Sequence, residues 1–387
     1  MSANQSLDIG VFGARSIPST YSGYETFLTT LLPELVARGH RVTMYCRRGE
    51  TDGTGEYLGV RRVLLPAIPG KQWNTLSHGL IASLAARAAN HDVVFAVNVA
   101  NAPFCAFHRM SNRPVVLNTD GQEWLRGKWG AAGRMFFKGS ARVAGQCATA
   151  LVSDCEAMAD VYRDEFHAQS TVIPYCVPAL DLRQETGVLE RLGVTPHEYF
   201  IVGARLNPEN NVDTIAEAYT RSSLPLTLLV LGAANYDSPV ADRLNDIATG
   251  DRRIRVLGHV DDRSEFFQLL GAARSYLHGH SVGGMNPSLV EAMHAGAYIA
   301  ALDTPFNRET LGAAGRYFTL DSLATELGEV LAETDDEARQ MRCEAQSRAA
   351  ARYSVAAVVD GYEELLISAA VSPSRGPVVV PTRWSLA

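Results

Sequence analysis

Short apolar runs alternate with amphipathic stretches along most of the chain. The first run, residues 9–12, leads through a Gly- and Pro-containing loop into an amphipathic stretch at about 24–38. Gly39 ends that stretch as a helix stop, and a second apolar run follows at 41–46. A helix between two strands is a crossover long enough for parallel pairing. The sequence therefore predicts that the chain begins with a doubly wound α/β domain.

The same alternation then continues and starts again after a linker. Further apolar runs lie at residues 92–97, 114–118, 148–153 and 171–174, and a second series lies at 199–203, 226–231, 254–257, 275–278 and 298–302. A polar, Pro-containing stretch to about Gly187 separates the two series. We predict two Rossmann-like α/β domains, each a doubly wound parallel sheet, that face each other across a cleft.

The expected domains cover nearly the whole chain. The N-terminal domain spans residues 1–178 and the C-terminal domain 179–354, with a long helical region at about 322–351. A further helix at about 355–370 is expected to pack back on the N-terminal domain. Residues 371–387 contain three prolines and little periodicity, and we expect a flexible tail there.

The composition argues against several classes of protein: nucleic-acid-binding, zinc or dithiol, secreted and membrane-spanning proteins. The 387 residues are 47% hydrophobic with a net charge of -7, which gives no general reason to expect nucleic-acid binding. The six cysteines are scattered without the close pairs of zinc or dithiol sites, which suits a reducing cytoplasm. No secretion signal is recognisable, and no apolar run approaches the roughly 20 residues that span a bilayer. We expect a cytoplasmic protein, at most peripheral to a membrane, with no metal or cofactor.

Ligands of open parallel sheets bind outside the carboxyl ends of the strands, so the loops there carry the candidate sites. The first loop runs from Gly13 to Gly23, contains Arg15 and is followed by Glu25. Its glycines permit close backbone approach, and the following helix offers its positive N-terminus to an anion. An ordinary strand-to-helix turn has the same glycines, so both interpretations stay open.

The second loop begins at Gly203 and contains Arg205 and Asn210. The planar guanidinium of Arg205 suits a diphosphate. A solvated arginine and an asparagine that caps a helix would give the same pattern.

The third loop follows the apolar run at 275–278 and is the most informative. It contains the candidate ligand-binding residues Gly283, Gly284, Met285, Asn286, Ser288 and Glu291. Adjacent glycines before a helix expose backbone N–H groups, and Ser288 can supplement them. Glu291 lies about one turn into the helix and is expected to face the same cleft. We predict that this loop holds a phosphate and a ribose together.

From about residue 9 to 366 the chain resembles glycosyltransferase family 4, and within it the bacterial subgroup that includes polysaccharide rhamnosyltransferases. Five ordered motifs carry the resemblance: SGYETF at 22–27, NTDGQEW at 118–124, RLNPENN at 205–211, HSVGGMNPSLVEAM at 280–293 and PFNRE at 305–309. The resemblance implies a GT-B fold, nucleotide-sugar binding on the C-terminal domain, acceptor binding on the N-terminal domain, and retention at the anomeric carbon.

The resemblance also implies roles for single residues. The later of two family glutamates matches Glu291, expected on the nucleotide ribose, whereas the earlier one falls on Gly283, so that the backbone would hold the donor sugar. A family lysine falls on Asn210, which leaves Arg205 as the main cation.

The N-terminal domain supplies two further candidates for catalysis. Asp120 stands where the family often has His, and it can bind a donor hydroxyl, orient the acceptor or assist proton removal; as the alternative, it caps a turn before Gly121. His78 is a candidate too, although a lone helical histidine is more often structural.

Together with the candidate residues, the resemblance implies a retaining, metal-independent glycosyltransferase of cell-surface polysaccharide synthesis. The expected donor is dTDP-L-rhamnose and the expected acceptor a glycan or lipid-linked saccharide. UDP-hexose or UDP-GlcNAc on the same fold is one alternative, and a non-catalytic nucleotide-sugar-binding protein is another. A nicotinamide dehydrogenase would need an acidic residue at the end of the second strand, where Cys46 and Arg47 stand.

Residues 124–138 combine aromatic and basic side chains. This composition suits peripheral contact with an anionic membrane face. Packing of Trp and Phe into the core of the first domain explains it equally well.

Overall fold

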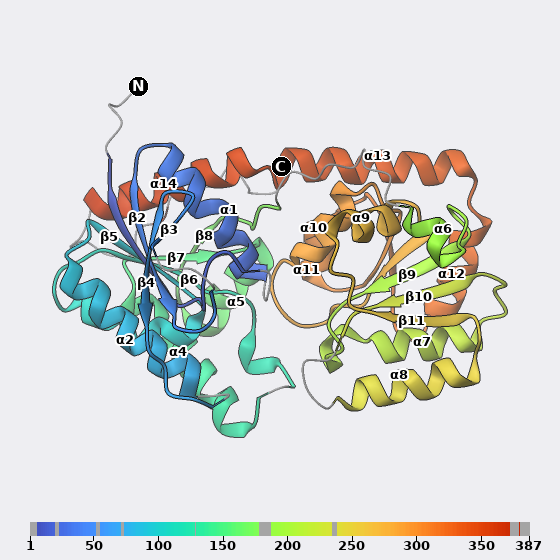
Figure 1. Ribbon diagram of the computed structural model, residues 1–387, viewed down its shortest axis with the longest axis horizontal. Helices are drawn as coiled ribbons and strands as arrows, with labels where there is room; N and C mark the ends of the chain where they lie inside the picture. Colours follow the sequence, from blue (N-terminus) through green and yellow to red (C-terminus); the bar gives the residue numbers. More distant parts are fainter. Residues whose placement is uncertain are drawn as a thin grey trace. The chain divides into compact units, whose positions relative to one another are not determined.

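The computed structural model describes residues 6–19, 23–51, 55–70, 73–127, 129–177, 187–233, 238–371 and 379. The chain forms two compact units. Unit 1 comprises Met1–Leu125, Trp129–Pro178 and Ser354–Ala387, and unit 2 comprises Arg126–Lys128 and Ala179–Tyr353. Each unit is built around its own sheet (Figure 1). The predicted α/β architecture of two doubly wound parallel sheets is confirmed.

The sheet of unit 1 has the strand order β3-β4-β2-β1-β5-β6-β7-β8. Its strands are β1 (Asp8–Phe12), β2 (Arg41–Arg47), β3 (Gly55–Tyr57), β4 (Val60–Leu65), β5 (Val93–Val97), β6 (Val115–Asn118), β7 (Ala150–Ser153) and β8 (Thr171–Val172). All neighbours pair in parallel except β3, which is antiparallel to β4. Every residue of β5 is buried and apolar, as expected for a strand covered on both faces.

The helices of unit 1 include one from the far end of the chain. They are α1 (Gly23–Ala37), α2 (Trp73–Ala89), α3 (Ala102–Arg109), α4 (Ala131–Cys147), α5 (Glu156–Phe166) and α14 (Val355–Val371), with short 3-10 turns η1 (Val99–Asn101) and η2 (Glu123–Leu125). The helix α14 contacts α1, β5 and β6. Its Tyr362 is buried and accepts a 2.8 Å hydrogen bond from the Asn118 amide.

An ion-pair cluster fixes α14 to the end of α1. The Arg38 guanidinium contacts Asp360 at 2.7 Å and Glu363 at 2.5 Å, and the His40 ring lies 2.9 Å from Glu363. Burial alone would raise the pKa of Glu363, but the hydrogen bonds from His40 and Arg38 outweigh it and lower that pKa.

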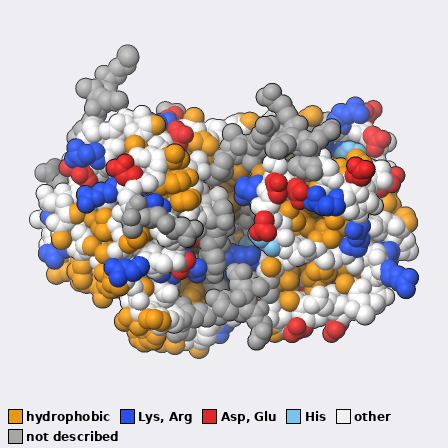
Figure 2. All heavy atoms as spheres, viewed as in Figure 1, with side chains coloured by type: hydrophobic (Ala, Val, Ile, Leu, Met, Phe, Trp, Pro, Cys, Tyr) orange, Lys and Arg blue, Asp and Glu red, His pale blue; other side chains and the backbone are white. Residues whose placement is uncertain are grey.

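The sheet of unit 2 has the strand order β11-β10-β9-β12-β13-β14, with parallel neighbours. Its strands are β9 (Tyr199–Gly203), β10 (Thr227–Leu231), β11 (Ile254–Gly258), β12 (Ser275–His278), β13 (Ile299–Leu302) and β14 (Arg316–Phe318). Its helices are α6 (Val188–Leu192), η3 (Pro208–Asn210), α7 (Val212–Arg221), α8 (Pro239–Gly250), α9 (Arg263–Gly271), α10 (Pro287–His294), α11 (Pro305–Leu311), α12 (Leu323–Ala332) and α13 (Asp335–Arg352). In the view of Figure 2, charged side chains lie on the outside of both units.

Two details differ from the sequence-based expectation. The pair β3 and β4 was missed because Arg61 and Arg62 interrupt the apolar pattern of an edge strand. The helical region expected at 322–351 is two helices, because the side chain of Thr334 and that of Glu337 form a capping box that starts α13. The expected tail, 371–387, lies almost entirely outside the described residues.

Candidate active site

The switch point of the sheet in unit 2 lies between β9 and β12, because the chain runs to opposite sides from these neighbouring strands. Ligands of open sheets bind at such a point. Two hydrogen bonds of 2.9 Å, from the backbone N–H and the hydroxyl of Ser281, reach the Glu209 carbonyl. The Asn211 amide donates to the Gly279 carbonyl at 2.7 Å. The second and third predicted loops are therefore tied together.

Arg205 follows β9 and is half-buried beside these contacts. Among the described residues, its guanidinium has no hydrogen bond or ion pair. The Asn210 side chain donates to the Arg205 carbonyl at 2.6 Å and so shapes the loop. Gly203 packs closely against α9, since a Cβ there would lie 3.2 Å from the ring of Phe266. Arg205 is thus a cation of unit 2 that is available to an anionic ligand.

Glu209 is a functional candidate that sequence reasoning missed. The residue is 6% exposed, and neither carboxylate oxygen has a hydrogen-bond partner within the part of the chain that the structure describes. A buried carboxylate without a partner is costly and is typical of a site completed by a ligand. In the sequence, a glutamate in a Pro-Glu-Asn turn is indistinguishable from a solvated one.

The loop before α10 has the backbone geometry that its glycines predict. Gly283 has a φ of 140°, a conformation that side chains rarely adopt. Asn286 caps α10, because its side-chain oxygen accepts from the Ser288 N–H at 3.0 Å and from the Ser288 hydroxyl at 2.7 Å. Gly284 is half-buried, whereas Met285 is buried, so Met285 can serve a ligand only through its backbone.

Glu291 lies on α10 and is 9% exposed. Its Oε1 accepts a 2.7 Å hydrogen bond from Nη2 of Arg263, the first residue of α9. Within the described residues, its Oε2 has no hydrogen bond. The sequence gives no hint of this pair, because the two residues are 28 positions apart and Arg263 lies in none of the five motifs.

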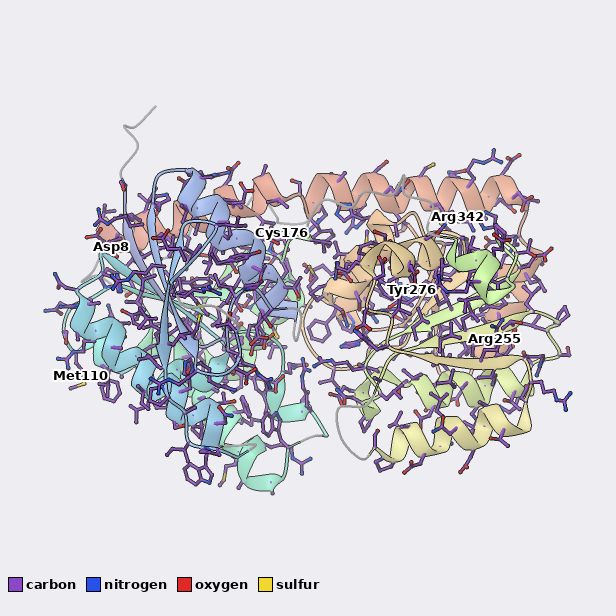
Figure 3. All side chains as sticks on the ribbon, in the orientation of Figure 1. Asp8, Met110, Cys176, Arg255, Tyr276 and Arg342 are labelled. Atoms are coloured by element: carbon purple, nitrogen blue, oxygen red, sulfur yellow. The ribbon has the colours of Figure 1, made fainter. Side chains whose placement is uncertain are left out.

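Two stacked histidines lie at the end of β12. The rings of His278 and His280 are 5.6 Å apart and inclined by 17°. Burial lowers the pKa of His278 to about 3, and burial with the charge of neighbouring groups holds the pKa of His280 well below its usual value. Both rings are therefore neutral at pH 7. The hydroxyl of Tyr276, labelled in Figure 3, lies 3.1 Å from Nδ1 of His278.

The fifth motif also supports this loop. The Asn307 amide donates to the carbonyl of His280 at 3.0 Å and to that of Leu302 at 2.8 Å. It therefore links the third loop to the end of β13.

In unit 1 the switch point lies between β1 and β5. Asp120, after β6, and Asn98, after β5, both have left-handed φ values, 56° and 68°. The Asn98 amide donates to Oδ2 of Asp120 at 3.2 Å, and the Asp120 N–H donates to the Asn118 side chain at 2.9 Å. Strained non-glycine residues persist where the surroundings enforce them, often at functional sites. Asn98 is a second residue that sequence reasoning missed.

The first predicted loop is shaped by a buried carboxylate. Gly13 has a φ of 108°, and a Cβ there would lie 2.2 Å from the Val97 carbonyl. Glu25 accepts from the Arg15 N–H at 2.9 Å and from the Ser19 hydroxyl at 2.8 Å, and burial raises its pKa. Gly23 is the first residue of α1, while residues 20–22 lie outside the described part. Glu25 therefore fixes the conformation of the loop through these two hydrogen bonds. The guanidinium of Arg15 lies 3.9 Å from the carboxylate of Glu50.

His78 lies on α2 and is almost fully buried. Burial, with the charge of Arg47, lowers its pKa to about 4, and its Nε2 has no hydrogen-bond partner among the described residues. The ring is neutral at pH 7, so it can accept but not readily supply a proton.

Residues 124–138 divide into buried and exposed parts. Trp124 and Phe137 are 4% and 6% exposed, and Trp124 packs edge-on against Phe166 at 5.3 Å. These two aromatic side chains belong to the core, as the structural alternative expected. Met135, in contrast, is 74% exposed.

The described residues contain no group of three or more His, Cys, Asp or Glu side chains placed to hold a metal. The same ranges contain no helix with both the length and the apolar character needed to cross a bilayer.

The chain was compared with family models, curated proteins and solved structures, and one family model matches part of it. Residues 22–176 match the family model described as a glycosyl transferase 4-like domain. No curated protein sequence matches the chain.

Solved structures resemble nearly the whole chain in fold. Sucrose-phosphate synthase from Thermosynechococcus elongatus has a TM-score of 0.78 and 16% identity, covering 92% of this chain and 98% of that one. HepE of Anabaena in complex with UDP-glucose has a TM-score of 0.74 and 17% identity, covering 94% and 100%. A UDP-forming α,α-trehalose-phosphate synthase from Burkholderia vietnamiensis has a TM-score of 0.76 and 12% identity, covering 96% and 100%. The chain therefore has the fold of GT-B glycosyltransferases, and its residues 22–176 are similar to the glycosyl transferase 4-like domain.

Proposed function

We propose that the protein is a retaining glycosyltransferase that moves a sugar from a nucleoside diphosphate to a saccharide or lipid-linked acceptor in polysaccharide synthesis. The observation that carries the proposal is the edge of unit 2 at which the loops after β9 and β12 are tied together. That edge collects the Arg205 guanidinium, which has no ion pair among the described residues, the Gly283 and Gly284 backbone, and the Glu291 carboxylate. A cation, exposed N–H groups and a carboxylate suit a diphosphate and a ribose.

The proposed chemistry needs no metal. As the bond from the anomeric carbon to the phosphate oxygen breaks, negative charge builds up on the β-phosphate. Arg205 and the N–H groups of Gly283 and Gly284 stabilise that charge, and Ser288 adds to them once its hydroxyl turns from Asn286 to the phosphate. The acceptor oxygen attacks from the same face, and its proton passes to the departing phosphate oxygen, so that the configuration is retained.

We propose dTDP-L-rhamnose as the donor. Gly283 stands where a carboxylate would bind the hydroxyls of the commoner hexoses, and Asn210 stands where a second cation is expected. UDP-hexose or UDP-GlcNAc is the second candidate, since HepE, similar in fold, binds UDP and UDP-glucose in its crystals. A binding protein without transfer is the third.

The test is a thermal-shift panel of nucleotide sugars, followed by transfer of radiolabelled sugar from the best ligand. We expect dTDP-L-rhamnose to raise the melting temperature most and to label an acceptor extract. If only a UDP-sugar stabilises the protein, that UDP-sugar is the donor in place of dTDP-L-rhamnose. If a nucleotide sugar stabilises the protein but no sugar is transferred, the protein is a nucleotide-sugar-binding protein without transfer. No shift with any nucleotide sugar would overturn the proposal.

We place the protein in the cytoplasm, with one face of unit 1 on the inner surface of the membrane. The supporting surface is formed by α2, α3 and α4, neighbours in contact. Within Trp73–Ala89, Ala102–Arg109 and Ala131–Cys147 the sequence contains no Asp or Glu. Exposed side chains on these helices, here called the basic face, are Trp73, Leu80, Leu84, Arg87, Arg134, Met135, Lys138 and Arg142.

The basic face combines the two features that anionic bilayers attract. Apolar side chains enter the interface, and each basic residue near it adds about 1 kcal/mol. Hydrophobic and basic side chains occur at the lower left of Figure 2, where Figure 1 draws α2 and α4. The exposed Met110, labelled in Figure 3, directly follows α3. This surface replaces the buried aromatic residues of 124–138 as the proposed contact.

Flotation of the full chain with vesicles tests the contact. Binding to phosphatidylcholine vesicles with added phosphatidylglycerol, and not to phosphatidylcholine alone, is expected. Replacing Arg134 and Arg142 together by Glu should weaken binding at least roughly thirty-fold, since about 1 kcal/mol is lost per residue. Replacing Arg221 and Arg252 together by Glu, at two exposed arginines of unit 2, is the control matched in charge. Equal binding of the double variant and the control would refute the contact.

A further inference from the structure

The ion pair between Arg263 and Glu291 involves only one of the two carboxylate oxygens of Glu291, a residue of the candidate site. Oε1 of Glu291 accepts from Nη2 of Arg263 at 2.7 Å, whereas Oε2 has no hydrogen bond among the described residues. The Glu291 side chain is 12% exposed and that of Arg263 is 43% exposed. The carboxylate is therefore partly desolvated, whereas its arginine partner is more open to solvent.

Arg263 is held where it meets Glu291. It is the first residue of α9, directly after the cap Asp262, and its guanidinium lies over the Phe267 ring at 4.9 Å from the centroid. A cation at a helix N-terminus is disfavoured by the helix dipole. The carboxylate offsets that penalty, and the aromatic ring orients the guanidinium. The pair is consequently a defined contact between α9 and α10.

A ribose presents two neighbouring hydroxyls, and a carboxylate binds both best when each oxygen accepts one. Here one oxygen already has a charged donor. We propose that Arg263 takes the place of the second sugar hydroxyl and thereby determines specificity: the site accepts 2′-deoxyribonucleoside diphosphates as well as ribonucleoside diphosphates. This inference rests on the proposed function and deepens it, because the 3′-hydroxyl alone is left to bind Oε2.

The test compares UDP with 2′-deoxy-UDP, which differ only in the 2′-hydroxyl, by calorimetry on the full chain. For the wild type we expect dissociation constants within roughly threefold of each other, because the Arg263 guanidinium already occupies Oε1 of Glu291, where the second hydroxyl would bind. In Arg263→Ala, Oε1 becomes available, and UDP should then bind roughly tenfold more tightly than 2′-deoxy-UDP.

Two further variants show that Glu291 carries the effect. The dissociation constants of UDP and 2′-deoxy-UDP should have the same ratio in Glu291→Gln and in the double variant Glu291→Gln with Arg263→Ala. This is expected for two residues that act through one contact. Arg243→Ala removes another arginine that pairs with a carboxylate, Glu217, on the surface of unit 2, and should leave the ratio unchanged. Melting temperatures establish that each variant is folded.

The outcomes separate this inference from the proposed function. If the wild type already prefers UDP by tenfold, or if Arg263→Ala weakens both nucleotides equally, Arg263 does not determine specificity although the nucleotide site stands. If neither nucleotide binds to the wild type, the proposed function itself is wrong.

Discussion

Asp120 combines a carboxylate with a backbone conformation that favours glycine, and this allows the two properties to be separated. Its φ is 56°, and its Oδ2 accepts a 3.2 Å hydrogen bond from Asn98. Asp120→Gly removes the carboxylate and relieves the left-handed strain. Asp120→Ala removes the same carboxylate but keeps a Cβ in the strained conformation. Both variants keep the backbone N–H that donates to Asn118.

The expected stabilities follow from these contacts. The hydrogen bond from Asn98 is worth about 1 kcal/mol, and both variants lose it. A left-handed residue with a side chain costs about 1 kcal/mol, which alanine keeps and glycine avoids. Glycine also raises the conformational entropy of the unfolded chain, and this offsets part of the stability that Asp120→Gly gains from the relieved strain. Because the wild type already carries this strain, we expect Asp120→Ala to lose about 1 kcal/mol of the free energy of unfolding and Asp120→Gly roughly half of that or less.

The assays are urea unfolding and sugar transfer on the same preparations. If the carboxylate acts on the acceptor or the donor, both variants should lose transfer by a factor of about 100 or more, although Asp120→Gly is nearly as stable as the wild type. Transfer within roughly threefold of wild type in either variant would assign Asp120 to the turn alone. Equal stability of the two variants would refute the strain argument.

Three other predictions concern binding and stability. Arg205→Ala combined with Glu291→Gln should weaken nucleoside diphosphate binding by about 100-fold in calorimetry, and unchanged affinity would contradict the proposed site. Burial lowers the pKa of His278 to about 3 in the folded protein. Between about pH 6.5 and pH 3, the His278 ring therefore takes up a proton only in the unfolded chain. Stability should therefore fall as the pH drops from 6.5 towards 3, and His278→Gln should make the melting temperature less dependent on pH. Glu363→Gln should cost about 1 to 3 kcal/mol in urea unfolding at pH 7. Since the folded pKa of Glu363 is lowered, that cost should be present above its ordinary value of 4.5 and vanish as the pH falls below it; a cost that persists at pH 3 would show another cause.

Most of the fold could be predicted from the spacing of apolar residues. Strands buried on both faces, such as β5 and β9, are uninterrupted apolar runs, and the glycines and prolines between elements mark the turns. The edge pair β3 and β4 was not predictable in this way. An edge strand with a solvent-facing side tolerates Arg61 and Arg62, which break the pattern.

The candidate site was predictable where backbone chemistry shapes it. Gly13 and Gly283 have positive φ values that follow from their place after a strand and before a helix. The pairs that join distant segments were not predictable. Arg263 meets Glu291, and Asn98 meets Asp120, only because the sheet order brings separate loops to one edge. A single sequence contains no signal for such contacts.

The helix α14 imposes an order on biosynthesis. Unit 1 is complete only when Tyr362 reaches Asn118 and Glu363 reaches Arg38, and these partners are separated by more than half of the chain. A ribosome makes the N-terminal segment first, so α1, β5 and β6 lack their contacts with α14 while all of unit 2 is translated. The unit that begins the protein is thus the last to be finished.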